Sequence, residues 1–173
     1  MNLSLSLATV AKHLPHAPAI TSEAGPISYG QFEQQAAAIA GALRHRHGLR
    51  PGQRVALAME NCAEFLPCLY GIWRAGLTAV PLNNKLHAKE MAWILENSET
   101  KLCLATPKIG DGLTSLVLTG VTIPPLIVTD TADYAQLHHA EPITQSPTEP
   151  DDEAWLFYTS GTTGRPKGAV LTH

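Results

Sequence analysis

Short apolar segments alternate with amphipathic ones along most of this 173-residue chain, and this alternation constrains its fold more than any other feature. The expected strands are residues 54–59, 77–82, 101–105, 126–129 and 154–158. Strands separated by helices need crossover connections, which place the strands parallel to one another. The segment Val55–Met59 is continuously apolar, which is typical of a sheet covered on both faces. We therefore predict an α/β fold with a largely parallel sheet flanked by helices.

Local boundary signals predict where the helices begin and end. Ser28 and Gln31 have the spacing of a capping box, which predicts a helix start, and Gly48 is suited to end that helix. Asn61 predicts a second start, with Pro67 kinking the helix that follows. Helices are also expected at 3–14 and 88–97, a weak one at 134–139, and short strands at 18–21 and 26–28. The type of segment 107–120 stays open, and the three prolines of 141–150 predict an exposed connector.

Composition and charge exclude several classes of protein. With 45% hydrophobic and 16% charged residues, the chain has the composition of a folded soluble protein. A net charge of −3 creates no general attraction to nucleic acid or to an anionic membrane. No apolar run approaches the roughly 20 residues of a membrane span, and the N-terminus lacks signal-peptide features. We therefore expect a cytoplasmic protein that does not bind nucleic acid and does not span a membrane.

Other conspicuous residues receive structural interpretations. The three cysteines lack CxxC spacing, so neither a metal site nor a disulfide framework is expected: Cys62, Cys68 and Cys103. The densest basic stretch is interpreted as a cationic helix end, because no aromatic residues are interleaved: Arg44, Arg46, Arg50 and Arg54. The pair His138-His139 is expected on the surface, without metal. The tryptophans are expected to pack in the core or at an interface: Trp73, Trp93 and Trp155.

The segment from Tyr158 to Gly168 carries the chemistry, and it follows the last expected strand directly. Four hydroxyl donors lie within five residues: Thr159, Ser160, Thr162 and Thr163. Three glycines permit backbone turns that point successive N–H groups at one anion: Gly161, Gly164 and Gly168. Lys167 adds a positive charge, and no acidic residue lies between Tyr158 and His173. This combination favours the binding of a polyphosphate over a simple Gly/Thr-rich surface turn.

Two familiar phosphate-binding motifs are excluded by spacing. A Walker A loop places Lys directly after Gly and a hydroxyl residue directly after Lys. Here Lys167 follows Pro166 and precedes Gly168. Gly161 and Gly164 are also wrongly spaced for the dinucleotide-binding motif G-x-G-x-x-G. A P-loop NTPase is therefore a weak alternative.

The segment YTSGTTGRPKGAVLTH closely resembles the signature of the adenylate-forming superfamily, which includes acyl-CoA synthetases and the adenylation domains of peptide synthetases. Earlier segments are similar to the same family: residues 27–29, 48–56, 74–83 and 94–98. The resemblance covers nearly the whole chain from about residue 18. It implies that residues 1–173 are the N-terminal portion of the AMP-binding domain, with a phosphate loop at 158–168.

The resemblance implies a two-step reaction. A carboxylate attacks the α-phosphate of ATP, pyrophosphate leaves, and the acyl-adenylate is transferred to a thiol, usually that of coenzyme A. Carried over by position, the residues expected to hold the β- and γ-phosphates of ATP are Thr159, Ser160, Gly161, Thr162, Thr163 and Gly164, with Lys167 supplying charge. Tyr158 is assigned to packing beneath the loop. The implied ligands are ATP, Mg²⁺, CoA and a carboxylic acid, with a fatty or aromatic acid favoured.

Several family segments have no counterpart in residues 1–173. The acidic magnesium ligand, the acyl pocket and the C-terminal lysine domain all lie downstream in the family. The chain alone is therefore expected to hold no catalytic residue, to be inactive and to self-associate through exposed sheet edges. Two further alternatives stay open. One is a noncatalytic nucleotide-binding or interaction module, and the other is part of a peptide-synthetase adenylation domain.

Overall fold

The computed structural model describes residues 1–159 and 166–173. A six-stranded sheet with the order β6-β5-β3-β4-β7-β8 forms its centre. The strands are β3 (Arg54–Ala58), β4 (Thr78–Pro81), β5 (Leu102–Ala105), β6 (Leu126–Val128), β7 (Glu153–Thr159) and β8 (Lys167–Thr172). All neighbours pair in parallel except β8, which is antiparallel to β7. The predicted α/β fold with a largely parallel sheet is confirmed.

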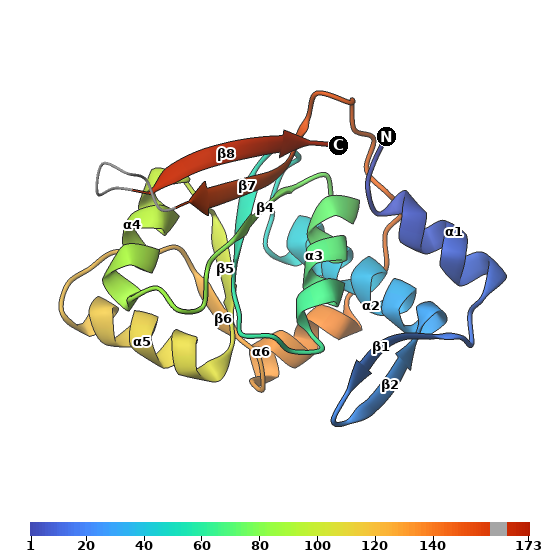
Figure 1. Ribbon diagram of the computed structural model, residues 1–173, viewed down its shortest axis with the longest axis horizontal. Helices are drawn as coiled ribbons and strands as arrows, with labels where there is room; N and C mark the ends of the chain where they lie inside the picture. The colour runs from blue at the N-terminus through green and yellow to red at the C-terminus, as the bar shows by residue number, and fades with distance from the viewer. Residues whose placement is uncertain (160–165) are drawn as a thin grey trace.

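The helices form a layer on each side of this sheet (Figure 1). They are α1 (Leu5–His13), α2 (Tyr29–Gly41), α3 (Phe65–Arg74), α4 (Ala88–Asn97), α5 (Pro107–Leu118) and α6 (Ala132–Ala135). A π-helical turn at Ala42–Arg46 continues α2, and a 3-10 turn at Gln136–His139 continues α6. Strands β1 (Pro18–Ser22) and β2 (Gly25–Ser28) make a separate antiparallel hairpin beside α2. The segment 107–120, whose type was left open, is therefore mainly helical.

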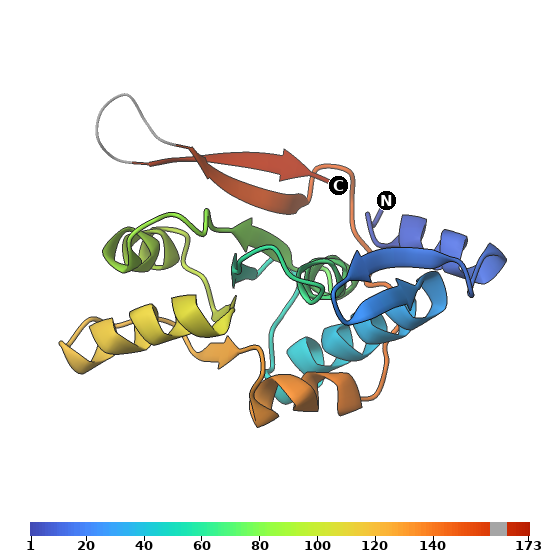
Figure 2. The ribbon, with the colours of Figure 1, turned by 60° about the horizontal axis from the view of Figure 1, so that its bottom comes forward.

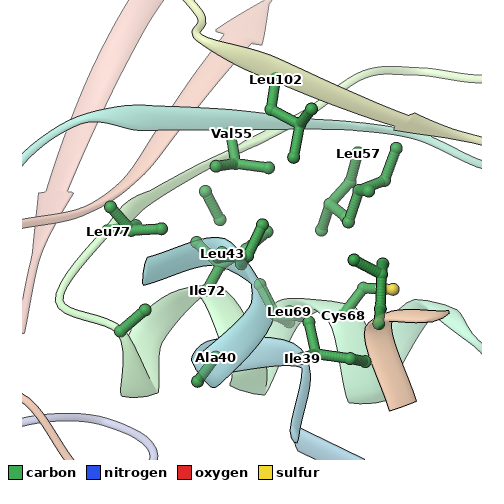
Figure 3. Packing of buried hydrophobic residues seen from close by; sticks show 14 of the residues in the cluster. Ile39, Ala40, Leu43, Val55, Leu57, Cys68, Leu69, Ile72, Leu77 and Leu102 are labelled. Atoms are coloured by element: carbon green, nitrogen blue, oxygen red, sulfur yellow. The ribbon is translucent and has the colours of Figure 1, made fainter. Parts of the chain in front are cut away.

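Alternate side chains of the central strands build two cores, as a sheet buried on both faces requires. One core joins Val55 and Leu57 to α2 and α3, where Ile39, Leu69 and Ile72 are almost fully buried (Figure 3). The other core joins Ala56 and Cys103 to α4 and α5 and has these large buried members: Met91, Ile94, Leu95 and Leu113. The short parallel strands are thereby fixed from both sides, which gives the strand ends defined positions.

The predicted capping box at the start of α2 is confirmed. Ser28 Oγ accepts a hydrogen bond from the Gln31 N–H, and Gln31 Oε1 accepts one from the Ser28 N–H. The predicted start of the next helix at Asn61 is wrong, because α3 begins at Phe65 with Glu64 in the capping position. Pro67 therefore lies in the first helical turn, where its missing N–H has no helical partner to lose. At this position Pro67 breaks no helical hydrogen bond, so the reason for expecting a kink is removed.

The connector at residues 141–150 has no regular secondary structure, but its predicted exposure is wrong for several positions. Ile143, Gln145, Ser146 and Thr148 are half-buried. The N–H of Ile143 donates to the carbonyl of Ala37, and the N–H of Ser146 donates to that of Arg74. Residues 141–148 therefore lie bound across α2 and α3, because these helices offer backbone and side-chain partners that a local sequence pattern cannot show.

Candidate nucleotide-phosphate site

Two of the residues predicted to bind phosphate face each other at the end of the β7–β8 hairpin. Thr159 is the last residue of β7, Lys167 is the first of β8, and the two are direct cross-strand partners. Both residues are exposed. Directly opposite residues in an antiparallel pair have Cβ atoms about 4.5–5.5 Å apart. A hydroxyl and an ammonium group therefore start from adjacent positions.

The other predicted phosphate ligands, Ser160, Gly161, Thr162, Thr163 and Gly164, lie outside the described residues. Their phosphate-binding role stays a prediction. The described ends of this segment nevertheless show where it is attached. Thr159 ends a strand that is parallel to β4, so the segment follows the carboxyl end of the parallel sheet. Open α/β sheets bind their ligands in the crevice beyond these carboxyl ends.

An ion pair holds the base of the hairpin. The Arg54 guanidinium on β3 donates from Nε to Glu153 Oε2 at 3.1 Å and from Nη2 to Glu153 Oε1 at 3.0 Å. Arg54 Nη1 also donates to the carbonyl of Ser98 at 3.1 Å. Interpreting Arg54 as part of a cationic helix end was therefore wrong; of that basic stretch, Arg44 and Arg46 lie in the π-helical turn. Arg54 instead fixes the strand that leads to the loop.

Backbone groups at the hairpin base have additional side-chain partners. Thr78 Oγ1 donates to the carbonyl of Glu153 at 3.0 Å, and Trp73 Nε1 donates to that of Ala154 at 2.9 Å. Trp73 is thus a packing residue, as predicted, and it contacts Trp155 edge-to-face at 4.7 Å between ring centroids. These contacts tie β7 to α3 and to the start of β4.

A second set of contacts lies at the other end of the hairpin. Tyr158 is half-buried, and its hydroxyl donates to Asn97 Oδ1 at 2.7 Å. Its ring meets Trp93 edge-to-face, with 6.2 Å between centroids and 89° between planes. Burial raises the pKa of Tyr158, although the positive charge of Arg54 acts in the opposite direction. The hydroxyl therefore stays protonated at neutral pH and remains a hydrogen-bond donor.

Sequence reasoning expected Tyr158 and Trp93 to pack but did not identify Asn97 as a partner. Asn97 was noticed only as the end of a helix, and no local signal connects it with a residue 61 positions away. The signal that was available is the aromatic residue directly before the Gly-rich segment, whose hydroxyl needs a partner when half-buried.

Within residues 1–159 and 166–173, no group of three or more His, Cys, Asp or Glu residues is arranged to hold a metal ion. In the same ranges, no helix is long and apolar enough to cross a membrane. The three cysteines are free, and Cys68 and Cys103 are buried. The hairpin end is the candidate site because two of the predicted phosphate ligands, Thr159 and Lys167, are paired there.

Together, these features define an α/β protein in which Thr159 and Lys167, the described ends of the Gly/Thr/Lys segment 159–168, meet at the carboxyl end of the parallel sheet. Residues 7–173 match the family described as AMP-binding enzyme. The chain belongs to this family, which confirms the resemblance seen in the sequence.

Individual relatives agree with the family assignment. A crotonobetaine/carnitine–CoA ligase of Escherichia fergusonii is 36% identical over 140 residues, covering 73% of this chain and 27% of that protein. A fatty acyl CoA synthetase of Mycobacterium tuberculosis superposes with a TM-score of 0.87 at 28% identity, over 99% of this chain and 34% of that one. A benzoate CoA ligase of Burkholderia xenovorans LB400 gives 0.88 at 25% identity, over 100% and 35%. The chain thus spans about a quarter of the curated relative's length.

Proposed function

We propose that this chain supplies the ATP phosphate-binding segment of an AMP-forming acyl-CoA ligase, an acid–thiol ligase. In this reaction a substrate carboxylate attacks the α-phosphate of ATP, the bond to the β-phosphate breaks, and pyrophosphate leaves. The thiol of CoA then attacks the acyl carbonyl of the acyl-adenylate and displaces AMP. The observation that carries the proposal is the direct pairing of Thr159 with Lys167 at the carboxyl edge of the sheet.

The contribution of these residues is electrostatic. Pyrophosphate accumulates negative charge as it leaves, and preorganised donors placed at that charge stabilise the transition state. Lys167 offers an ammonium group with three N–H donors, and Thr159 offers a hydroxyl donor beside it. We propose that they contact the β- and γ-phosphates together with residues 160–164. Mg²⁺ would neutralise further phosphate charge, with its protein ligand in a later segment of the full-length enzyme.

The substrate class is proposed from the relatives. Those described above are named for crotonobetaine or carnitine, for fatty acyl groups and for benzoate. We favour a fatty or aromatic carboxylic acid as the substrate and CoA as the thiol acceptor. We further propose that residues 1–173 alone do not complete adenylation, since the chain corresponds to only 27% of the length of the crotonobetaine/carnitine–CoA ligase. Two alternatives remain, a peptide-synthetase adenylation domain and a noncatalytic nucleotide-binding module. The reaction products distinguish the first from this proposal, and the absence of any product distinguishes the second.

The proposal is tested on the full-length protein by ATP–pyrophosphate exchange with a panel of carboxylic acids, followed by detection of the CoA thioester. The panel should include fatty acids, benzoate, crotonobetaine and carnitine. Exchange and thioester formation with one acid class is the expected outcome. Exchange with amino acids and transfer to a carrier protein would indicate a peptide synthetase, and binding of ATP without exchange would indicate a noncatalytic module.

The role of the hairpin is tested by Lys167→Ala. Losing a charged donor at a developing phosphate charge should reduce transition-state stabilisation by about 1–3 kcal/mol, which lowers kcat/KM for ATP roughly 5- to 150-fold. Lys101→Ala is the matched control, since Lys101 is an exposed lysine that directly precedes β5 and so lies at the amino end of the parallel strands, away from the carboxyl end where β7 reaches Thr159. Equal ATP kinetics for the two variants would remove Lys167 from the phosphate site.

A further inference from the structure

The end of the β7–β8 hairpin extends beyond its support from the sheet. The parallel register between β4 and β7 holds a single pair, Ala79 with Trp155, and β4 ends at Pro81. β7 continues to Thr159, and every residue of β8 is exposed. Figure 2 shows the hairpin projecting away from the remaining strands. The end that carries Thr159 and Lys167 therefore needs another contact to hold it in place.

Helix α4 provides that contact through Tyr158. The Tyr158 hydroxyl donates to Asn97 Oδ1 at 2.7 Å, and the Tyr158 ring packs edge-to-face on Trp93. Asn97 is the last residue of α4, and Trp93 lies one turn earlier on the same helix. Because α4 is packed into the sheet through Met91 and Ile94, it is a firm attachment point for the hairpin.

The same ring also constrains the opposite strand. Gly168 is the cross-strand partner of Tyr158. A Cβ atom at Gly168 would lie 3.1 Å from Leu156 Cδ1, 3.5 Å from Tyr158 Cζ and 3.7 Å from Tyr158 Cε1. The glycine thus leaves the space beside the ring free, and the ring lies close against the backbone of β8. Holding Tyr158 therefore holds both strands immediately before Thr159 and immediately after Lys167.

We propose that Asn97 and Tyr158 are positioning residues that orient Thr159 and Lys167 toward the phosphates of ATP. This inference rests on the proposed phosphate-binding function of the hairpin. Neither residue contacts phosphate. Their hydrogen bond restricts the angle at which the hairpin leaves the sheet, and the two phosphate donors move with that angle. Without the bond the donors sample more orientations, and ATP binding has to overcome the extra conformational freedom.

The experiment measures MgATP binding to the full-length protein by isothermal titration calorimetry. Tyr158→Phe removes only the donor hydroxyl, and Asn97→Leu removes the side-chain amide that contains the acceptor. Each is expected to raise the Kd for MgATP about three- to tenfold, the effect of losing one net hydrogen bond. Asn97→Asp keeps an acceptor oxygen and should restore binding close to wild type. The double variant should match the single variants, because one shared contact is lost.

The fitted stoichiometry separates positioning from a loss of folded protein. A purely structural defect lowers the number of binding sites per chain and leaves the Kd of the remaining sites unchanged, which would overturn the inference. Tyr134→Phe is the matched control, because it removes a buried hydroxyl that contacts Cys68 Sγ, not the hairpin. Its Kd should equal that of the wild type.

The outcomes also distinguish this inference from the function on which it rests. If Lys167→Ala weakens MgATP binding while Tyr158→Phe and Asn97→Leu do not, the positioning role is overturned and the phosphate site stands. If the two single effects multiply in the double variant, the residues act separately and the positioning pair is overturned. If the wild type binds no MgATP, or Lys167→Ala leaves its Kd unchanged, the proposed function fails, and the inference fails with it.

Discussion

Replacing Gly41 with alanine should destabilise the protein, although alanine is the better helix former. Gly41 is the last residue of α2 and has helical backbone angles, with φ −60° and ψ −45°. A Cβ atom there would lie 2.0 Å from the carbonyl oxygen of Glu141 and 3.1 Å from its carbonyl carbon. Both atoms belong to the backbone of the connector, so the clash cannot be relieved by a side-chain rotation. The connector itself would have to move.

The magnitude follows from two opposing effects. Alanine gains about 1 kcal/mol over glycine in helix propensity. Against this, the Glu141 carbonyl must retreat by about 1 Å or more to reach van der Waals contact, and such overpacking costs about 1–3 kcal/mol. The displacement also strains the hydrogen bond from the Ile143 N–H to the Ala37 carbonyl, with a net value of about 1 kcal/mol. We expect a net loss of about 1–3 kcal/mol in the free energy of unfolding.

Urea unfolding with matched glycine variants measures this effect. Gly112 lies within α5, and a Cβ atom there would make an ordinary van der Waals contact of 3.6 Å with Ala88 Cβ. Gly112→Ala should therefore raise the unfolding midpoint, with a gain of about 0.5–1 kcal/mol, while Gly41→Ala lowers it at an unchanged urea dependence. Equal or greater stability of Gly41→Ala would refute the reasoning, because the connector would then not press on α2.

Two further measurements test other parts of the structure. Burial lowers the pKa of His47, His138 and His173 below the ordinary value of about 6.5. Near and below pH 6.5 the unfolded chain therefore binds more protons than the folded chain. The free energy of unfolding should be highest above this pH and should fall as the solution is acidified. A variant with Gln at all three positions should lose less stability between pH 7 and pH 5, and an equal loss would contradict the assignment. Val170 and Leu171 are exposed on the edge strand β8, so the isolated chain should self-associate. Light scattering that gives a monomeric mass at high protein concentration would contradict this.

The parts of the fold that sequence reasoning predicted correctly depend on contacts between near neighbours. The capping box joins Ser28 to a residue three positions away, and strand β3 is marked by its own continuous apolar residues. The prediction failed at Asn61 for a related reason. Asn61 and Glu64 have the spacing of a helix start, but the helix begins later, at Phe65. Residues can therefore have the spacing of a helix cap without a helix beginning there.

The connector and the hairpin could not be predicted in this way. Residues 141–148 contain no apolar period, and their burial depends on α2 and α3, which precede them by many residues. Strand β8 is antiparallel and exposed along its whole length, and its apolar residues are limited to the run 169–171, so it lacks the buried apolar pattern that marked the parallel strands. Its presence depends on pairing with β7, and only a structure with both strands placed shows that pairing.

The candidate site combines a local and a distant part, and the two carry different information. The chemistry of the Gly/Thr/Lys segment is local, so the sequence alone indicates a polyphosphate ligand. Strand β7, which leads to Thr159, is held by distant contacts: Arg54 meets Glu153 across 99 positions of sequence, and Asn97 meets Tyr158 across 61. Substitutions in the segment should therefore change which contacts ATP makes. Substitutions at Arg54 or Asn97 should change how often those contacts are correctly oriented, and so act on affinity without touching the ligand.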